Sequence, residues 1–285
     1  MEMQEESKGL GIHARRIVAY IVLVLVSVLC LFWFVILFIN ATRSNAEMVR
    51  GFTIIPSTHL VENWKNLLAG TLPLWAGLRN SVFVSAATAI VSTYFSAMTA
   101  YGIHVYRFKG RKFISTFILA VMMIPTQVTA LGFIKLIRQL HMIDTFWPLI
   151  IPSIAAPAVY FYMKQYLDSV LPLSIVEAAR IDGAGEFKTF NTIVLPMVKP
   201  AIAVQAIFNF VSSWNNYFTP ALVLSTDTKK TLPILIAMLR AADWMKFDMG
   251  QVYVMIAFAI LPVLVVYLIL SKSIIAGVTL GSVKG

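Results

Sequence analysis

The stretch "EAARIDGAGEFKTFNTIVLP" at residues 177–196 interrupts a chain that is otherwise strongly apolar. Of the 285 residues, 59% are hydrophobic and 13% are charged, and the mean hydropathy is +0.81. Soluble domains carry about 25% charged residues, so this composition is typical of a protein with many membrane spans. The charged and small residues of 177–196 therefore indicate a task outside the lipid.

Six apolar stretches surround this segment. They cover residues 17–39, 81–106, 113–133, 146–166, 198–224 and 251–271. About 20 apolar residues cross a bilayer as a helix, so each stretch is long enough. We therefore predict an all-α polytopic membrane protein with six transmembrane helices. Its parts are an N-terminal tail at 1–16, a transmembrane region at 17–273 with a loop at 168–197, and a C-terminal tail at 274–285.

The distribution of positive charge predicts the orientation of these helices. The net charge is +10 and the pI is about 9.7, but Lys and Arg form no basic patch with interleaved aromatic residues. This pattern favours topology signals beside anionic lipid over nucleic-acid binding. The segment "RFKGRK" at 107–112 has four basic residues in six, and Arg15 and Arg16 precede the first stretch. We therefore place both termini and segment 177–196 in the cytoplasm.

The two longest segments on the opposite side of the membrane have their own character. Within 40–80, "STHLVENWKNLLAG" has apolar residues near helical spacing, which predicts a short helix on the membrane surface. The segment 225–250 has mixed polarity. We expect it to fold against the spans.

Signatures of catalysis and of metal or nucleotide binding are absent from the sequence. It has one cysteine, no histidines at metal-ligand spacing and no G-x-x-x-x-G-K-[ST] motif. The predicted spans carry almost no ionisable residue, which argues against a proton-coupled transporter because a carried proton needs a titrating group. A sodium-coupled secondary transporter remains open on these residues, as does a membrane enzyme or scaffold.

The segment 177–196 contains start and stop signals for two short helices. Ser174 stands three residues before Glu177, which is the S-x-x-E capping box and predicts a helix that begins at Ser174. Gly183 is a natural helix stop, and a second helix can begin near Glu186 and end at Pro196. On physical grounds alone, this helix pair is either a linker or a docking surface for another protein.

The spacing within this segment resembles the EAA motif of ABC importer permeases. The positions that match are Glu177, Ala178, Ala179, Gly183, Ile193, Leu195 and Pro196. The run "RIDGAG" at 180–185 is similar to the carbohydrate branch of that family. Other stretches that resemble the maltose-type permeases are "RNSVFVS" (79–85), "MMIPTQV" (122–128), "FNFVSSWNNYFTPALVL" (208–224), "TLP" (231–233) and "GSVKG" (281–285).

The resemblance implies the permease subunit of an ATP-driven importer in a prokaryotic plasma (inner) membrane. Such a subunit translocates a sugar or oligosaccharide delivered by an extracytoplasmic binding protein. Its other partners are a second homologous permease and two copies of a cytoplasmic P-loop ATPase. The ATPase subunits bind ATP and Mg²⁺. This chain would have no cofactor, no metal and no enzymatic activity of its own. The ATPases would drive alternating access through the coupling-helix loop. The coupling residues are Glu177, Ala178, Ala179, Arg180, Asp182, Gly183, Ile193, Leu195 and Pro196.

Three further groups of residues are predicted to contact substrate or partners. Rings and amides suit a neutral sugar, and the candidates are Trp214, Asn215, Asn216 and Tyr217. Packing of Trp214 against a neighbouring helix remains the alternative. The candidates for binding-protein docking are Ala242, Asp243, Trp244 and Lys246. In the maltose-type subunits the C-terminal tail reaches between the two ATPases, which implies a role for Gly281, Lys284 and Gly285.

Overall fold

The computed structural model describes residues 2–241 and 248–282, and the regular structure in this range is entirely helical. The all-α prediction is therefore confirmed. The chain divides into two compact units. The first comprises Met1–Thr71 and Leu239–Phe258, and the second comprises Leu72–Met238 and Ala259–Gly285.

In the first unit, a polar turn joins α1 (Glu2–Ala41) to α2 (Asn45–Val49). Ser44 and Glu47 form a reciprocal capping box at the start of α2, because each side chain accepts the backbone N–H of the other. The buried Asn63 amide donates to the carbonyl oxygens of Ala41 (3.0 Å) and Arg43 (2.9 Å). These bonds satisfy backbone groups at the end of the long helix, where no intrahelical partner exists.

The short helix predicted in segment 40–80 is α3 (Leu60–Ala69). Leu67 is buried, and the Trp64 ring centroid lies 5.3 Å from that of Phe258. Leu60 and Val61 are exposed. One face of α3 therefore packs within its unit, and its location on the membrane surface stays a prediction.

Three helices within the described residues are long and apolar enough to cross a membrane. They are Arg15–Ala41 within α1, α4 (Leu74–Val105), and Met249–Ser271 within α15 (Met249–Ser282). They correspond to the first, second and sixth predicted spans. The pair Glu186–Met197 and Lys199–Trp214, bent by 81°, is a fourth candidate. The count of six crossings therefore stays a prediction.

The third, fourth and fifth predicted spans are not continuous helices. They divide into α5 (Arg111–Val121) and α6 (Thr126–Gln139); α7 (Trp147–Ile150), η1 (Ile151–Ile154) and α8 (Pro157–Val170); and α12 (Lys199–Trp214) and α13 (Phe218–Val223). Pro125 and Pro157 account for the first two breaks, because proline lacks an N–H and disfavours a helical residue before it. The third break follows Asn215, and there Asn216 Oδ1 accepts the N–H of Thr219 (3.3 Å).

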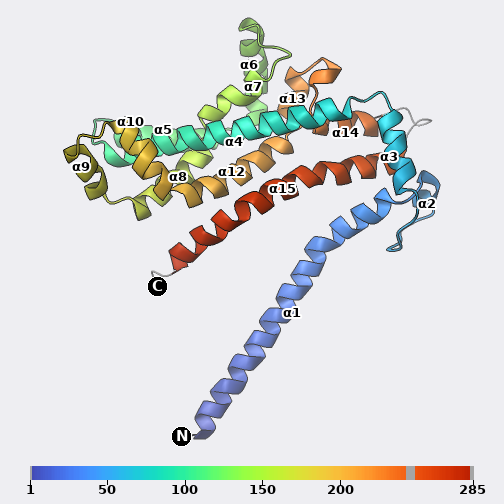
Figure 1. Ribbon diagram of the computed structural model, residues 1–285, viewed down its shortest axis with the longest axis horizontal. Helices are drawn as coiled ribbons and strands as arrows, with labels where there is room; N and C mark the ends of the chain where they lie inside the picture. The colour runs from blue at the N-terminus through green and yellow to red at the C-terminus, as the bar shows by residue number, and fades with distance from the viewer. Residues whose placement is uncertain (1, 242–247, 283–285) are drawn as a thin grey trace. The chain divides into compact units, whose positions relative to one another are not determined.

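In the second unit, α4 packs along α12 and α8, and Figure 1 shows these three helices as the centre of that unit. Small side chains allow a close approach between helices in lipid. The buried small residues of α4 are Gly77, Ser81, Ser85, Ala89, Ser92, Thr93, Ser96, Ala97 and Ala100. Met163 and Leu167 of α8 are fully buried in this core.

The segment 225–250 begins with η3 (Asp227–Lys229) and α14 (Leu232–Arg240), and this part packs against α4 as expected. A Cβ atom on Gly77 would lie 2.4 Å from Cδ1 of the fully buried Leu235. The Asn80 amide donates to the carbonyl oxygens of Thr228 (2.9 Å) and Lys230 (3.0 Å). Glycine and a buried amide therefore hold the start of the segment close to α4.

Candidate functional site

The segment predicted to couple the chain to an ATPase lies wholly within the second unit and forms a helix pair. Its first helix is α9 (Leu173–Ile181). The predicted capping box at Ser174 and Glu177 is wrong, because the N-cap residue is Pro172 and no side chain caps the helix. Pro172 has a fixed φ of −65° and an extended ψ of 138°, so the helix begins before Ser174 can take the cap position.

The turn after α9 confirms the prediction that Gly183 stops the helix. Gly183 has a φ of +74°, in the left-handed region. Its N–H donates to the Arg180 carbonyl (3.0 Å), and the Ala184 N–H donates to the Ala179 carbonyl (2.9 Å). These two bonds form a Schellman motif, which satisfies the last carbonyl groups of the helix and turns the chain sharply.

The second helix of the pair is a continuous run of α10 (Glu186–Thr189), η2 (Phe190–Val194) and α11 (Leu195–Met197). It begins at Glu186 as predicted, but it passes through Pro196 and does not end there. The Leu195 N–H donates to the Phe190 carbonyl, which is a π-helical bond one residue longer than normal. The helix thus accommodates Pro196, and the 81° bend into α12 comes after Met197.

The coupling residues divide between an outer and an inner face of this helix pair. Glu177, Ala178, Asp182 and Pro196 are exposed, whereas Ala179 is buried and Ile193 and Leu195 are half-buried. The Glu177 carboxylate makes no hydrogen bond or ion pair within the described residues. The motif therefore supplies both the core contacts that seat the pair and an outer surface that is free to meet a partner.

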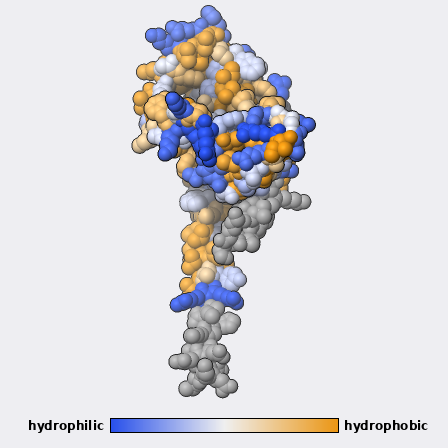
Figure 2. Space-filling model, turned by 90° about the vertical axis from the view of Figure 1, so that its left-hand side faces the viewer, coloured by the Kyte–Doolittle hydropathy of each residue, from blue (hydrophilic) through white to orange (hydrophobic). Residues whose placement is uncertain are grey.

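Two apolar side chains beside the motif project from the same helix pair. Ile181 is 87% exposed and Phe187 is 69% exposed. In Figure 1, α9 and α10 lie at one end of the second unit, and Figure 2, which views that end, shows hydrophobic and hydrophilic surface side by side. Large side chains exposed to this degree on a short helix pair are typical of a protein–protein contact. The sequence analysis did not single out either residue.

A polar network attaches the helix pair to the end of α4. Arg180 Nε lies 2.7 Å from Glu186 Oε1, and the Tyr101 hydroxyl donates to Glu186 Oε2 (3.1 Å). The Arg180 guanidinium also lies over the Tyr106 ring, 5.6 Å from its centroid. Arg180 therefore has partners within the subunit while its side chain stays exposed, and its assignment to the coupling surface remains a prediction.

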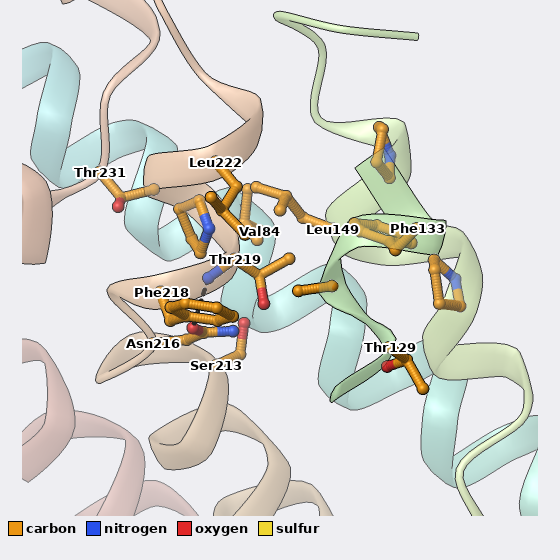
Figure 3. Close-up of a pocket in the computed structure, with 14 residues that line it drawn as sticks. Val84, Thr129, Phe133, Leu149, Ser213, Asn216, Phe218, Thr219, Leu222 and Thr231 are labelled. Atoms are coloured by element: carbon orange, nitrogen blue, oxygen red, sulfur yellow. Dashed lines mark hydrogen bonds between the residues drawn. The ribbon is translucent and has the colours of Figure 1, made fainter. Parts of the chain in front are cut away.

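A cavity of about 290 Å³ lies elsewhere in the second unit, between α4, α6, the α7–η1 segment and α13. Figure 3 shows Ser213, Asn216, Phe218 and Thr219 on one side of it, with Thr129 and Phe133 opposite. The remaining lining residues are Val84, Ala130, Pro148, Leu149, Pro152, Pro220, Leu222 and Thr231. The breaks at Pro125 and Asn215 permit this arrangement, because they leave non-helical backbone beside a hollow in the protein.

Of the predicted substrate residues, only Asn216 lines this cavity. Trp214 is 4% exposed and stacks on Phe210, with ring centroids 5.6 Å apart and an interplanar angle of 18°. Trp214 is therefore buried and stacked on a residue of its own helix, α12, whereas the alternative interpretation expected packing against a neighbouring helix. Asn215 and Tyr217 are exposed outside the lining.

A carboxylate joins two loops near the cavity. Asp144 accepts the backbone N–H groups of Ser225 (2.9 Å) and Thr226 (3.1 Å) and the Thr226 hydroxyl (2.6 Å), and Lys229 Nζ lies 3.0 Å away. The Thr226 hydroxyl is the main reason that the pKa of Asp144 falls well below its usual range, and the backbone N–H groups add to it. Asp144 itself has a φ of +60°. We call this contact the Asp144 clamp.

Some predicted site residues lie outside the described part of the chain. These are the docking candidates Ala242, Asp243, Trp244 and Lys246 and the tail residues Lys284 and Gly285. Gly281 lies within α15, which runs to Ser282, so helix extends into the predicted C-terminal tail.

Comparison with known families decides what this membrane protein is. Residues 92–279 match the family "Binding-protein-dependent transport system inner membrane component". The chain belongs to this family. It is an integral membrane protein and the permease component of an ABC importer, which decides against a stand-alone sodium-coupled transporter and against a membrane enzyme.

Relatives match the permease over nearly its whole length. It is 34% identical to the arabinooligosaccharides transport system permease protein AraQ of Bacillus subtilis, covering 95% of this chain and 96% of AraQ. It is 30% identical to the sn-glycerol-3-phosphate transport system permease protein UgpE of Brucella abortus (92% and 95%). It is 29% identical to the trehalose/maltose transport system permease protein MalG of Thermococcus litoralis (95% and 98%).

The fold also matches a solved transporter. A chain in the crystal structure of a bacterial ABC transporter involved in the import of the acidic polysaccharide alginate superposes with a TM-score of 0.77 at 22% identity, covering 90% of this chain and 95% of that one. At this identity the likeness shows the fold alone. Helical breaks within the permease are therefore compatible with an ABC importer architecture.

Proposed function

We propose that this permease subunit imports a sugar or oligosaccharide and is driven by separate ATPases that grip the outer face of the α9–α10 helix pair. An extracytoplasmic binding protein delivers the sugar, and a second homologous permease completes the membrane pathway. ATP and Mg²⁺ are bound by the two ATPase subunits. Both termini and the helix pair face the cytoplasm.

The sugar class is supported by the relatives. The names of two of them specify arabinooligosaccharides and trehalose or maltose as their substrates. A third name specifies lactose, in the lactose transport system permease protein LacG of Rhizobium radiobacter, which is 28% identical to this chain. A fourth name specifies sn-glycerol 3-phosphate, which is a polyol that carries a phosphate. The shared feature of these ligands is a polyhydroxylated carbon skeleton.

The observation that carries the coupling role is the division of the EAA segment into an anchored and an exposed half. Arg180 and Glu186 pair with each other and attach the helices to α4, while Glu177 and Ile181 are exposed and have no such contact. A helix pair with carboxylates at Glu177 and Asp182 that have no partner among the described residues, and with projecting apolar side chains, fits a groove on a partner protein. Movement of that partner would then be transmitted to α4 and α12.

Exchange of charge at Glu177 tests this proposal. We expect Glu177→Lys to leave membrane insertion and pairing with the second permease intact, but to release the ATPase and abolish sugar uptake. Ile181→Ser should weaken ATPase retention through the apolar contact. The matched control is Glu62→Lys, since Glu62 has a side chain that is 65% exposed on α3, far from the helix pair in sequence.

The measurement is the molar ratio of ATPase to permease after affinity purification, with sugar uptake measured in the same cells. Full retention of the ATPase by both Glu177→Lys and Ile181→Ser would show that the helix pair is a linker. Loss of the ATPase in Glu62→Lys as well would point to general misassembly.

A further inference from the structure

The wall of the cavity is uncharged. None of its 14 lining residues is charged or is a histidine. The Asp144 clamp, an ionic cluster of the same unit, is satisfied within itself by Thr226 and Lys229. A ligand in this cavity would therefore meet no charged side chain in the described lining.

Polar groups in the wall are short of hydrogen-bond partners. Oδ1 of the Asn216 side chain accepts the Thr219 N–H, but Nδ2 of the same side chain has no partner among the described residues. The hydroxyls of Ser213 and Thr219 are also without a partner there. Thr231 is 4% exposed, and its hydroxyl is also without a partner in that part of the chain. Thr231 is buried and the other three residues are half-buried, so the wall offers free hydrogen-bonding groups to a polar occupant.

Aromatic rings complete the two sides of the hollow. Phe218 lies beside Asn216 and Ser213, and Phe133 lies across the cavity from them (Figure 3). Rings offer flat apolar faces to C–H groups, while hydroxyl and amide groups donate and accept hydrogen bonds. The volume of about 290 Å³ is at the small end of the roughly 300–1,000 Å³ that is usual for ligand sites. It suits one ring and not a chain of rings.

We propose that this cavity binds one ring of an uncharged sugar on its way through the permease. Hydroxyl groups of the ring would take the open positions at Ser213, Asn216 and Thr219, and its C–H face would lie against Phe218 or Phe133. A phosphorylated or carboxylated sugar is disfavoured here, because the lining offers no charged side chain to pair with an anion and removal of an unpaired charge from water is unfavourable. This inference rests on the proposed sugar import.

A cysteine at the cavity wall tests whether sugar enters it. The single natural cysteine is removed by Cys30→Ser, and Ser213→Cys or Ser212→Cys is introduced. Ser212 is the exposed neighbour outside the lining, and it is the matched control. The complete complex with its binding protein is treated with N-ethylmaleimide in the presence and absence of sugar, and labelling of this chain is followed by mass spectrometry.

We expect a transported neutral sugar to slow labelling of Ser213→Cys and to leave Ser212→Cys unchanged. The probes are maltose, lactose and arabinobiose as neutral sugars, with galacturonate and sn-glycerol 3-phosphate as anions. If a sugar that the complex transports changes the labelling rate of neither cysteine, the cavity assignment is overturned. Protection by an anionic probe in preference to the neutral ones would overturn the assignment to uncharged sugars.

Transport by the reconstituted complex separates failure of this inference from failure of the proposed function. Thr219→Val keeps shape and the backbone N–H but removes the hydroxyl, so sugar moved per ATP hydrolysed should fall roughly threefold to tenfold. ATP hydrolysis stimulated by the loaded binding protein should persist, which a folding defect would not allow. An unchanged amount of sugar moved per ATP hydrolysed in Thr219→Val and Ser213→Ala would refute the cavity site and leave sugar import intact. Absence of uptake of every probe by the unaltered complex would instead refute sugar import itself.

Discussion

Replacement of Gly183 by alanine isolates the backbone requirement of the coupling turn. A Cβ atom added at Gly183 meets nothing within 4 Å, so the substitution creates no clash inside the subunit. The cost comes only from φ of +74°, a conformation that disfavours a side chain by about 1–2 kcal/mol. We therefore expect the turn of Gly183→Ala to open roughly 5 to 30 times more often than that of the unaltered protein.

Gly185 provides a matched control two residues away. A Cβ there also meets nothing within 4 Å, but φ is −68° and ψ is 154°, which any residue adopts. Alanine is a poorer N-cap than glycine, while it lowers the entropy of the unfolded chain, and these effects of under about 1 kcal/mol oppose each other. Gly185→Ala should therefore be close to neutral.

Hydrogen exchange measures the difference directly. The N–H groups of residues 183 and 184 close the Schellman motif on the carbonyls of Arg180 and Ala179, so their protection reports opening of the turn. Faster exchange in Gly183→Ala but not in Gly185→Ala is expected, with ATPase retention reduced in parallel and reduced further in Gly183→Val. Equal protection in the two alanine variants would refute the argument that the left-handed turn requires glycine.

Three further predictions concern other parts of the chain. Asp144 has a pKa well below its ordinary 3.8, so the Asp144 clamp should stabilise the loops at 141–146 and 224–229 fully above pH 3.8. This contribution should decline as pH falls below 3.8 and disappear once pH falls through the lower pKa of the folded state. Asp144→Asn should remove the pH dependence and cost about 1–3 kcal/mol at pH 7, measured as protection of these loops from hydrogen exchange at pH 7 and pH 3, and identical profiles for the two proteins would contradict this. In a Cys30→Ser background, Gly110→Cys should resist a membrane-impermeant maleimide in intact cells, and rapid labelling would reverse the proposed orientation. Deletion of residues 281–285 should lower coupled ATP hydrolysis while insertion persists, and full transport by the truncated protein would show the tail to be dispensable.

Local sequence signals predicted the features that depend on neighbouring residues. The apolar composition identified a membrane protein, because about 20 apolar residues suffice to span lipid whatever the rest of the chain does. Gly183 was recognised as a stop because the left-handed turn is a property of the backbone at that residue. The EAA spacing predicted the permease family, and the family match confirms it.

Errors arose where two local signals competed. Ser174 and Glu177 satisfy the capping-box pattern, but Pro172 presets the helix start and leaves Ser174 inside α9. The helices of three predicted spans are interrupted at Pro125, at Pro157 and at the Asn215–Asn216 pair, and a count of apolar residues does not register such interruptions. The number of membrane crossings stays a prediction. Each of these residues is a helix-breaking signal in the sequence, but the prediction followed the length of the apolar stretch instead.

Long-range pairing was decided by the tertiary structure alone. Glu186 meets Tyr101 across 85 residues, and Asp144 meets Thr226 across 82 residues. Asn216 lines a cavity while Trp214 packs on Phe210, although both belong to the same short motif. The physical reason is that helix periodicity and turn chemistry are set within a few residues, whereas the partner of a side chain depends on which helices pack together.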